Sequence, residues 1–214
     1  MEERILYINE ECKKMVTFDT SIQVLENLHQ VVQFGRFIYC VYMAKAGGIT
    51  VPVLLDGRTE FGVGVCMEVP STVLTFYEAG GKRHFCLRVI RGEVVQDGDF
   101  RPRQNLDMRV VGRLIKFEKT RLRKVTACNL DFICCSLLIQ NESRHKAALQ
   151  MVAFQGTALQ VDSLAARSLI EIKGRLVNQK YAKGFEINLN EIVQVRKETT
   201  SAGYWNQEAV IATG

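Results

Sequence analysis

Basic side chains are concentrated in one stretch of the chain, from residue 105 to residue 197, and aromatic residues are interspersed among them. This stretch holds 16 Lys and Arg against 8 Asp and Glu, a net charge of +8, whereas residues 1–104 carry −1 and residues 198–214 carry −2. Cations gathered in this way suit contacts with phosphates, and exposed aromatic rings suit stacking on bases. The charge pattern therefore favours a nucleic acid as partner, with a merely solvated basic face as the alternative.

No common catalytic motif is found in the sequence. Gly57 and Gly62 have the spacing of a phosphate-binding loop, but Val63 stands where that loop needs its lysine. The three histidines lie far apart, and none has a carboxylate or a thiol at ligand spacing. Asp97 and Asp99 are typical of a solvated turn rather than a metal site. We therefore expect no enzyme, no cofactor and no metal, and an enzyme would require a site whose spacing conceals it.

The seven cysteines are an odd number without a Cys-x-x-Cys pair, which fits a reduced compartment and small core side chains. The start Met1–Arg4 is acidic where a signal peptide is basic and then apolar. The longest apolar run, Phe132–Ile139, is shorter than the roughly 18 residues of a membrane-spanning helix. We expect a cytoplasmic, nucleoid-associated protein, or an organellar one in a eukaryote.

The first half of the chain combines one expected helix with a β-rich pattern. From Asp19 to Gln33 apolar residues recur at steps of three and four, which predicts an amphipathic helix. Glycines then separate short runs of Val, Ile, Phe, Tyr and Cys, and Gln96–Asn105 is typical of a linker. We therefore expect a divergent β-rich domain over residues 1–100, a second domain over 105–197 and a tail over 198–214.

The second half of the chain carries a pattern of five strands and one helix. The helix is expected between Gly156 and Arg167, in the gap between the third and fourth strands, where the five-stranded oligonucleotide-binding barrel has its helix. The strands are expected at Asp107–Phe117, Leu130–Gln140, Ala147–Phe154, Leu169–Gln179 and Glu186–Val195.

The two halves also resemble each other in two short segments. Phe34–Ile38 matches Val111–Ile115 at an offset of 77 residues, and Ile90–Val95 matches Ile172–Val177 at an offset of 82. Such matches favour two copies of one unit. The predicted fold class is thus all-β with short helices, in the form of tandem five-stranded barrels of which the first is divergent. An unrelated β-rich first domain is the alternative.

Residues 106–197 contain a series of short motifs in a fixed order. They are Val110–Leu114, Phe132–Cys135, Met151–Phe154, and Ile172–Leu176 followed by Lys180 and Tyr181. In order and spacing they resemble successive strands of bacterial single-stranded DNA-binding proteins. Leu122–Val125 is also similar to primosomal replication protein N, a relative in that superfamily.

The resemblance implies where a strand would bind. Phe154 falls on the stacking phenylalanine of the family's third strand, and Tyr181 falls on the stacking tryptophan after its fourth strand. Phe117 is a further candidate ring, whereas Phe132 and Phe185 are expected to point into the barrel. A core position is the alternative for Phe154. The candidate phosphate-binding cations are Arg113, Lys116, Lys119, Arg121, Arg123, Lys124, Arg144, Lys146, Lys173, Arg175, Lys180 and Lys183.

The sequence departs from the family in lacking a tryptophan in the second strand, one at the start of the third, and the acidic recruiting tail. This favours a specialised plasmid, phage, primosomal or organellar relative. The expected function is single-stranded DNA binding in replication, recombination or mobile-element maintenance, as a homo-oligomer. The first barrel is expected to self-associate or to bind a replication protein. RNA binding, or a scaffold subunit with weak nucleic-acid binding, are the alternatives.

Overall fold

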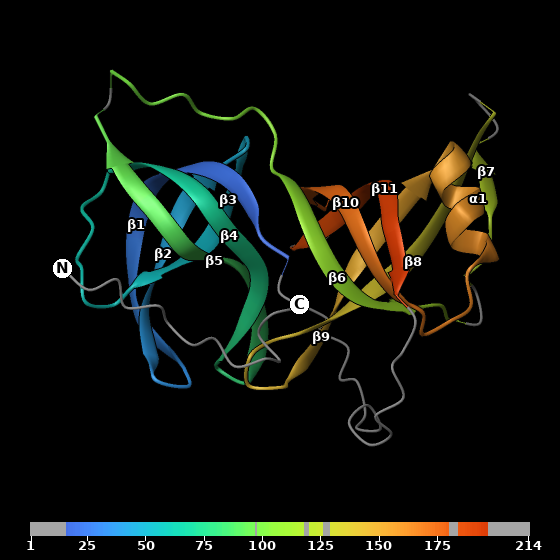
Figure 1. The fold of residues 1–214 in the computed structure, drawn as a ribbon, viewed down its shortest axis with the longest axis horizontal. Helices are drawn as coiled ribbons and strands as arrows, with labels where there is room; N and C mark the ends of the chain where they lie inside the picture. The colour runs from blue at the N-terminus through green and yellow to red at the C-terminus, as the bar shows by residue number, and fades with distance from the viewer. Residues whose placement is uncertain (1–15, 97, 118–119, 126–128, 180–183, 197–214) are drawn as a thin grey trace.

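The computed structural model describes residues 16–96, 98–117, 120–125, 129–179 and 184–196. Within these ranges it contains eleven strands and one helix, arranged as two barrels side by side (Figure 1). The first barrel consists of β1 (Phe18–Phe34), β2 (Phe37–Ala46), β3 (Ile49–Asp56), β4 (Cys66–Ala79) and β5 (Lys82–Val95). The second consists of β6 (Asp107–Ile115), β7 (Arg123–Val125), β8 (Leu130–Gln140), β9 (Lys146–Phe154), α1 (Gln155–Ser163), β10 (Leu169–Asn178) and β11 (Phe185–Arg196).

Both barrels have the same strand pairing. In the first, β1 pairs with β2 and β4, β2 with β3, and β4 with β5, all antiparallel, while β3 and β5 are parallel. In the second, β6, β8, β9, β10 and β11 repeat these pairings in the same order, with β9 and β11 as the parallel pair and β7 added at the edge of β8. The expected tandem of five-stranded oligonucleotide-binding barrels is therefore confirmed.

The short sequence matches between the halves do not join equivalent positions. Phe34–Ile38 spans the turn between the first and second strands of its barrel, whereas Val111–Ile115 lies within β6, a first strand. Ile90–Val95 belongs to a fifth strand and Ile172–Val177 to a fourth strand. The matches reflect the shared composition of strands, and the duplication is visible only in the order of pairing.

The helix expected over Asp19–Gln33 is wrong, because this segment is most of β1. Ile22 and Val24 are fully buried at a period of two, as in a strand with one face on a core. Two register shifts against β2 then change the face that each side chain occupies. The shifts produce the apparent helical spacing, and Leu25 and Val31, assigned to the apolar face of the helix, are 39% and 67% exposed.

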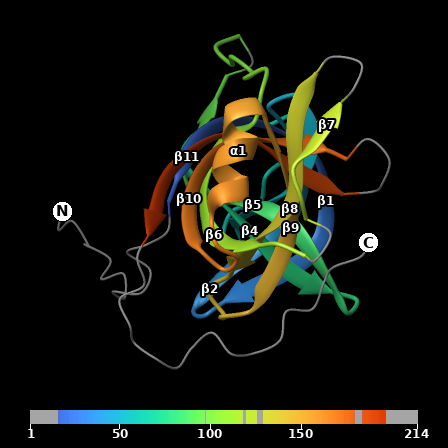
Figure 2. The same cartoon turned by 90° about the vertical axis from the view of Figure 1, so that its right-hand side faces the viewer.

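The elements expected in the second half are confirmed with small changes at their ends. β8 has the expected bounds, and α1 lies between the third and fourth strands of the barrel. Ala158 and Val161 are the buried residues of α1, which packs against β8, β9 and β11. Figure 2 shows α1 lying across one end of the second barrel. Ala158 and Val161 belong to the same cluster of buried residues as the barrel core.

Two glycines allow strands of the second barrel to approach closely. A Cβ atom at Gly112 would lie 2.6 Å from Leu137 Cγ and 2.8 Å from the carbonyl oxygen of Leu138. A Cβ atom at Gly174 would lie 2.6 Å from Ile187 Cγ2. Both positions therefore exclude a side chain, so that β6 can close on β8 and β10 on β11.

Candidate nucleic-acid interface

A row of three side chains crosses the outer face of β7, β8 and β9. Arg123 is paired in register with Phe132, and Phe132 with Phe154. Residues paired in this way point to the same face of a sheet. The two rings lie 6.4 Å apart between centroids at 33°, Phe154 is 39% exposed, and Arg123 is exposed. The row thus offers two rings and a guanidinium to solvent within three adjacent strands.

The outward position of Phe132 corrects the expectation that it points into the barrel. Ile133 and Cys135 are buried in the core, so Phe132 and Cys134, at the alternate positions of the strand, face outward. Cys134 is exposed and Phe132 is half-buried beside Phe154. Phe185, in contrast, packs against the barrel core as expected.

Polar side chains continue this face beyond the aromatic row. Gln150 is paired with both Ser136 and Glu186, and it accepts a hydrogen bond of 3.0 Å from Nε2 of Gln179. Burial raises the pKa of the Glu186 carboxyl. Burial also raises the pKa of the Cys134 thiol, which Arg123 opposes and Glu186 reinforces. The Cys134 thiol is therefore protonated and uncharged at neutral pH.

The connection from β6 to β8, together with β7, carries further exposed candidate residues. Phe117 is 46% exposed, and Arg121 and Lys124 are exposed. Lys116 is turned away toward α1, where its Nζ donates to the carbonyl oxygens of Asp162 at 2.8 Å and Leu164 at 2.6 Å. These contacts hold the base of the connection against the helix.

Two of the candidate cations are buried. Arg113 and Lys146 are each only 9% exposed, and Nη1 of Arg113 donates to the carbonyl oxygen of Arg167 at 3.1 Å. Their burial leaves neither side chain open for a phosphate contact, and Lys146 begins β9 at the opposite end from Phe154. Arg144 is exposed on the turn next to Lys146.

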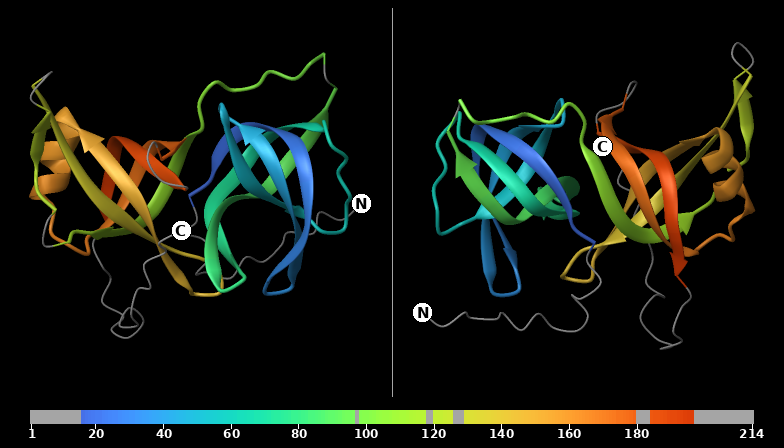
Figure 3. Two further views of the ribbon diagram at one scale, coloured as in Figure 1. Left: turned by 180° about the vertical axis from the view of Figure 1, so that it is seen from behind. Right: turned by 45° about the horizontal axis from the view of Figure 1, so that its top comes forward.

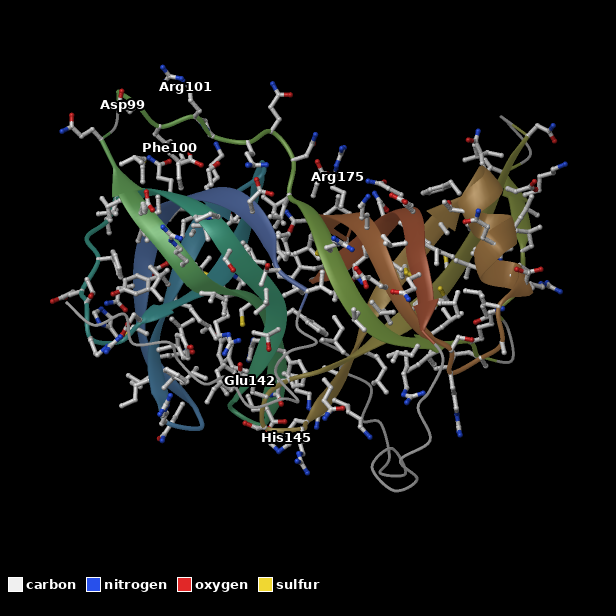
Figure 4. All side chains as sticks on the ribbon, in the orientation of Figure 1. Asp99, Phe100, Arg101, Glu142, His145 and Arg175 are labelled. Atoms are coloured by element: carbon white, nitrogen blue, oxygen red, sulfur yellow. The ribbon has the colours of Figure 1, made fainter. Side chains whose placement is uncertain are left out.

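Two more candidate cations are paired with carboxylates on another part of the barrel. Nζ of Lys173 lies 2.9 Å from a carboxylate oxygen of Glu191, and Nε of Arg175 lies 3.1 Å from a carboxylate oxygen of Asp107. Arg109 pairs with the buried Glu171 on the same strands, β6 and β10. Figure 4 shows Arg175 on the side of the molecule away from the β8–β9 turn, which is marked there by Glu142 and His145. The charges of Lys173 and Arg175 are therefore compensated within the barrel.

Neither a family model nor a curated protein matches this sequence. Among solved structures, wild-type single-stranded DNA-binding protein from Thermus aquaticus is similar, with a TM-score of 0.59 and 15% identity over 88% of this chain and 97% of that one. A deletion variant of that protein gives a TM-score of 0.61 at 15% identity, over 89% of this chain and 100% of the other. The chain shares its fold with these proteins. The fold implied by the resemblance to single-stranded DNA-binding proteins is thereby confirmed, and nothing in the comparison points to primosomal replication protein N in particular.

Four candidate residues lie outside the part of the chain that the structure describes: Lys119, Lys180, Tyr181 and Lys183. Their roles stay predictions. Within the described ranges, no group of three or more His, Cys, Asp or Glu residues is placed to hold a metal ion, and no helix is long and apolar enough to cross a membrane.

Proposed function

We propose that this protein is a non-catalytic binder of single-stranded nucleic acid, DNA first, through the outer face of β7, β8 and β9. The observation that carries the proposal is the row formed by Arg123, Phe132 and Phe154. Oligonucleotide-binding barrels use the outer face of their second and third strands, together with neighbouring loops, to bind a strand. In this chain those strands are β8 and β9.

The physical basis is stacking combined with phosphate neutralisation. Exposed rings bind bases of any sequence, at roughly 1–3 kcal/mol per stacked base. Phe154 and Phe132 supply adjacent rings, while Arg123 and Lys124 supply charges at the edge of the same sheet. Because Lys173 and Arg175 are paired with carboxylates, the exposed cations near β7 are the better candidates for phosphate contacts.

The test is fluorescence-anisotropy titration with a labelled oligo-dT of about thirty nucleotides at several salt concentrations. We expect steep weakening with salt and no competition from duplex DNA. Arg123→Gln should reduce the salt slope by about 0.7, the single-strand value for one phosphate contact, whereas Arg175→Gln should leave it unchanged. Absence of binding at low salt and micromolar protein would contradict the proposal and favour a scaffold role.

Competition with oligo-U in the same titration distinguishes a DNA ligand from an RNA ligand. Stacking and phosphate contacts act equally on both sugars, so recognition of RNA would require a contact to the 2′-hydroxyl. Preferential competition by oligo-U would assign the protein to RNA. A preference for oligo-dT would support a role in replication, recombination or mobile-element maintenance.

Self-association is part of the proposal for the first barrel. Val31, Phe37 and Ile38 are 67%, 43% and 52% exposed on the β1–β2 hairpin, and apolar side chains gathered in this way favour a protein contact. Sedimentation velocity of the wild-type chain and of Ile38→Ser should show a larger species that the substitution dissociates. A wild-type monomer at all concentrations would remove oligomerisation from the proposal.

A further inference from the structure

The two barrels use the same face of their sheet differently. In the first barrel, the outer face of β2, β3 and β5 corresponds by topology to the face of β8, β9 and β11 in the second. Tyr42, Val53 and Leu87 belong to the main core, whereas Val41 and Leu54, which are paired with each other, belong to a separate cluster on the outer face. This outer cluster consists of Phe34, Tyr39, Val41, Leu54, Tyr77 and Cys86, and all six are buried.

Arg88 lies within this covered face. It is paired with Leu54 across β5 and β3 and is 4% exposed. Its guanidinium lies 6.0 Å from the ring centroid of Phe34 and 5.8 Å from that of Tyr39. It forms an ion pair with Glu142, which belongs to the turn between β8 and β9 of the second barrel. A carboxylate of the same chain thus compensates a charge that would be costly to bury alone.

The residues around Glu142 also contact the first barrel. Nδ2 of Asn141 donates to the carbonyl oxygen of Phe76 at 3.5 Å, and Nδ1 of His145 lies 3.4 Å from a carboxylate oxygen of Glu78. Arg83 donates to the carbonyl oxygen at the start of β9. Figure 3 shows the tip of the β8–β9 hairpin lying beside the β4–β5 hairpin.

A second contact between the barrels involves the linker. The backbone N–H of Arg103 donates to Oγ of Ser21 at 2.9 Å. Gly47, at φ +51°, lies so close to the linker that a Cβ atom would be 2.0 Å from the backbone nitrogen of Leu106. The turn between β2 and β3 therefore lies directly against the linker. Two contacts at separate places fix one barrel relative to the other.

We propose that the first barrel is a fixed base for the β8–β9 hairpin, which docks on it through Glu142 and Arg88, and that each chain has one strand-binding surface. β8 and β9 carry the docked turn at one end and the Phe132–Phe154 pair at the other. The docked turn holds the end of the two strands that form the binding face. This inference rests on the proposed function, because it assigns the strand to the second barrel.

The first experiment counts strands per chain. A short oligo-dT of about ten nucleotides, titrated at low salt and at a concentration well above Kd, should saturate the wild-type chain at one strand. The double variant Phe132→Leu with Phe154→Leu should lose binding at least tenfold. Saturation at two strands, or binding that the double variant retains in full, would overturn the inference. No binding by the wild-type chain would instead remove the proposed function, and the docking would then be tested by cleavage alone.

The second experiment separates the barrels by substitution. Glu142→Ala should increase tryptic cleavage at Arg101 and Arg103 at least fivefold and weaken strand binding about three- to tenfold. Glu60→Ala, which changes an exposed carboxylate of the first barrel, is the control and should do neither. If Glu142→Ala is cleaved faster but binds the strand as tightly as wild type, the first barrel does not support the binding surface. If its cleavage is unchanged, the β8–β9 hairpin is not docked through Glu142.

A third variant, Gly47→Ala, tests the contact between the first barrel and the linker without changing a charge. Gly47→Ala should also increase linker cleavage, because its Cβ atom would meet the linker backbone. Gly35→Ala is matched to it, since Gly35 also has a positive φ, +58°, in a turn of the first barrel, but a Cβ atom there would have no other atom within 4 Å. Equal cleavage of the two variants would contradict the second contact.

Discussion

The rings of the second barrel differ in the face that they occupy. The resemblance to known strand-binding proteins singles out Phe154, and the structure places this ring on the outer face with 39% exposure, while its stacking role stays a prediction. Sequence reasoning misses Phe132 because it begins an apolar run in which Cys134 and Leu138 are apolar as well. Such a run gives no period of two, so the sequence alone does not separate its inner from its outer side chains. The burial of Ile133 and Cys135 and the pairing of Phe132 with Phe154 in the structure do so.

The aromatic pair should account for a measurable part of strand affinity. Phe154→Leu and Phe132→Leu keep an apolar side chain but remove the ring, so each should weaken oligo-dT binding by roughly 1–3 kcal/mol, or about 5- to 150-fold. Anisotropy titration measures the change, and circular dichroism checks the fold. Leu159→Ala, at an exposed position of α1, should leave the affinity unchanged. Equal affinities for all three variants would place the strand elsewhere.

Glu186 should make strand binding dependent on pH. Its folded pKa is raised by burial, so it binds a proton at a higher pH than an ordinary Glu, and protonation removes a negative charge from the binding face. Affinity for oligo-dT should therefore increase as the pH falls from 7 toward the raised pKa. Glu186→Gln should bind more tightly at pH 7 and change less with pH, whereas Glu191→Gln should follow the wild-type profile. A Glu186→Gln profile identical to wild type would contradict the assignment.

Among the elements, the second barrel was largely predictable and β1 was not. β8 and β10 lie between clear turn signals, and the gap that holds α1 shows its own helical spacing. In β1 the register shifts against β2 change the period of the apolar residues from two to a mixture of three and four. A bulge depends on how two strands pair, so the sequence of one strand alone does not predict it.

The close approach of β6 and β8 should be sensitive to a single methyl group. Gly112→Ala would place its Cβ atom against Leu137 and against a backbone oxygen, so overpacking should cost about 1–3 kcal/mol of unfolding free energy. Gly156→Ala is the matched substitution, because Gly156 lies in α1 with open space around it and should gain about 0.5–1 kcal/mol. Urea denaturation measures both, and a neutral Gly112→Ala would contradict this account of barrel closure.

The described part of the chain consists of two barrels with one topology that differ in the exposure of one face. The face is open around Phe154 in the second barrel and covered around Arg88 in the first. This difference in exposure depends on contacts between side chains of the two barrels. The short sequence matches between the halves therefore could not predict it.

The contacts between the barrels should appear in thermal unfolding. Wild-type protein should unfold in one calorimetric transition, because neither barrel can unfold without exposing its contacts with the other. Glu142→Ala should separate the trace into two transitions, since it leaves the buried Arg88 without this carboxylate in the first barrel. Two transitions in the wild-type protein would indicate barrels that unfold independently.

The ion pair between Arg88 and Glu142 also has a consequence for synthesis of the chain on the ribosome. The last strand of the first barrel ends at Val95, and Glu142 follows 47 residues later. At about 5–20 residues per second, the first barrel emerges roughly 2–9 s before the carboxylate that completes it. During that interval the nascent barrel holds Arg88 near its aromatic rings before Glu142 has been synthesised, so the contact between the barrels forms only after the β8–β9 hairpin has been translated.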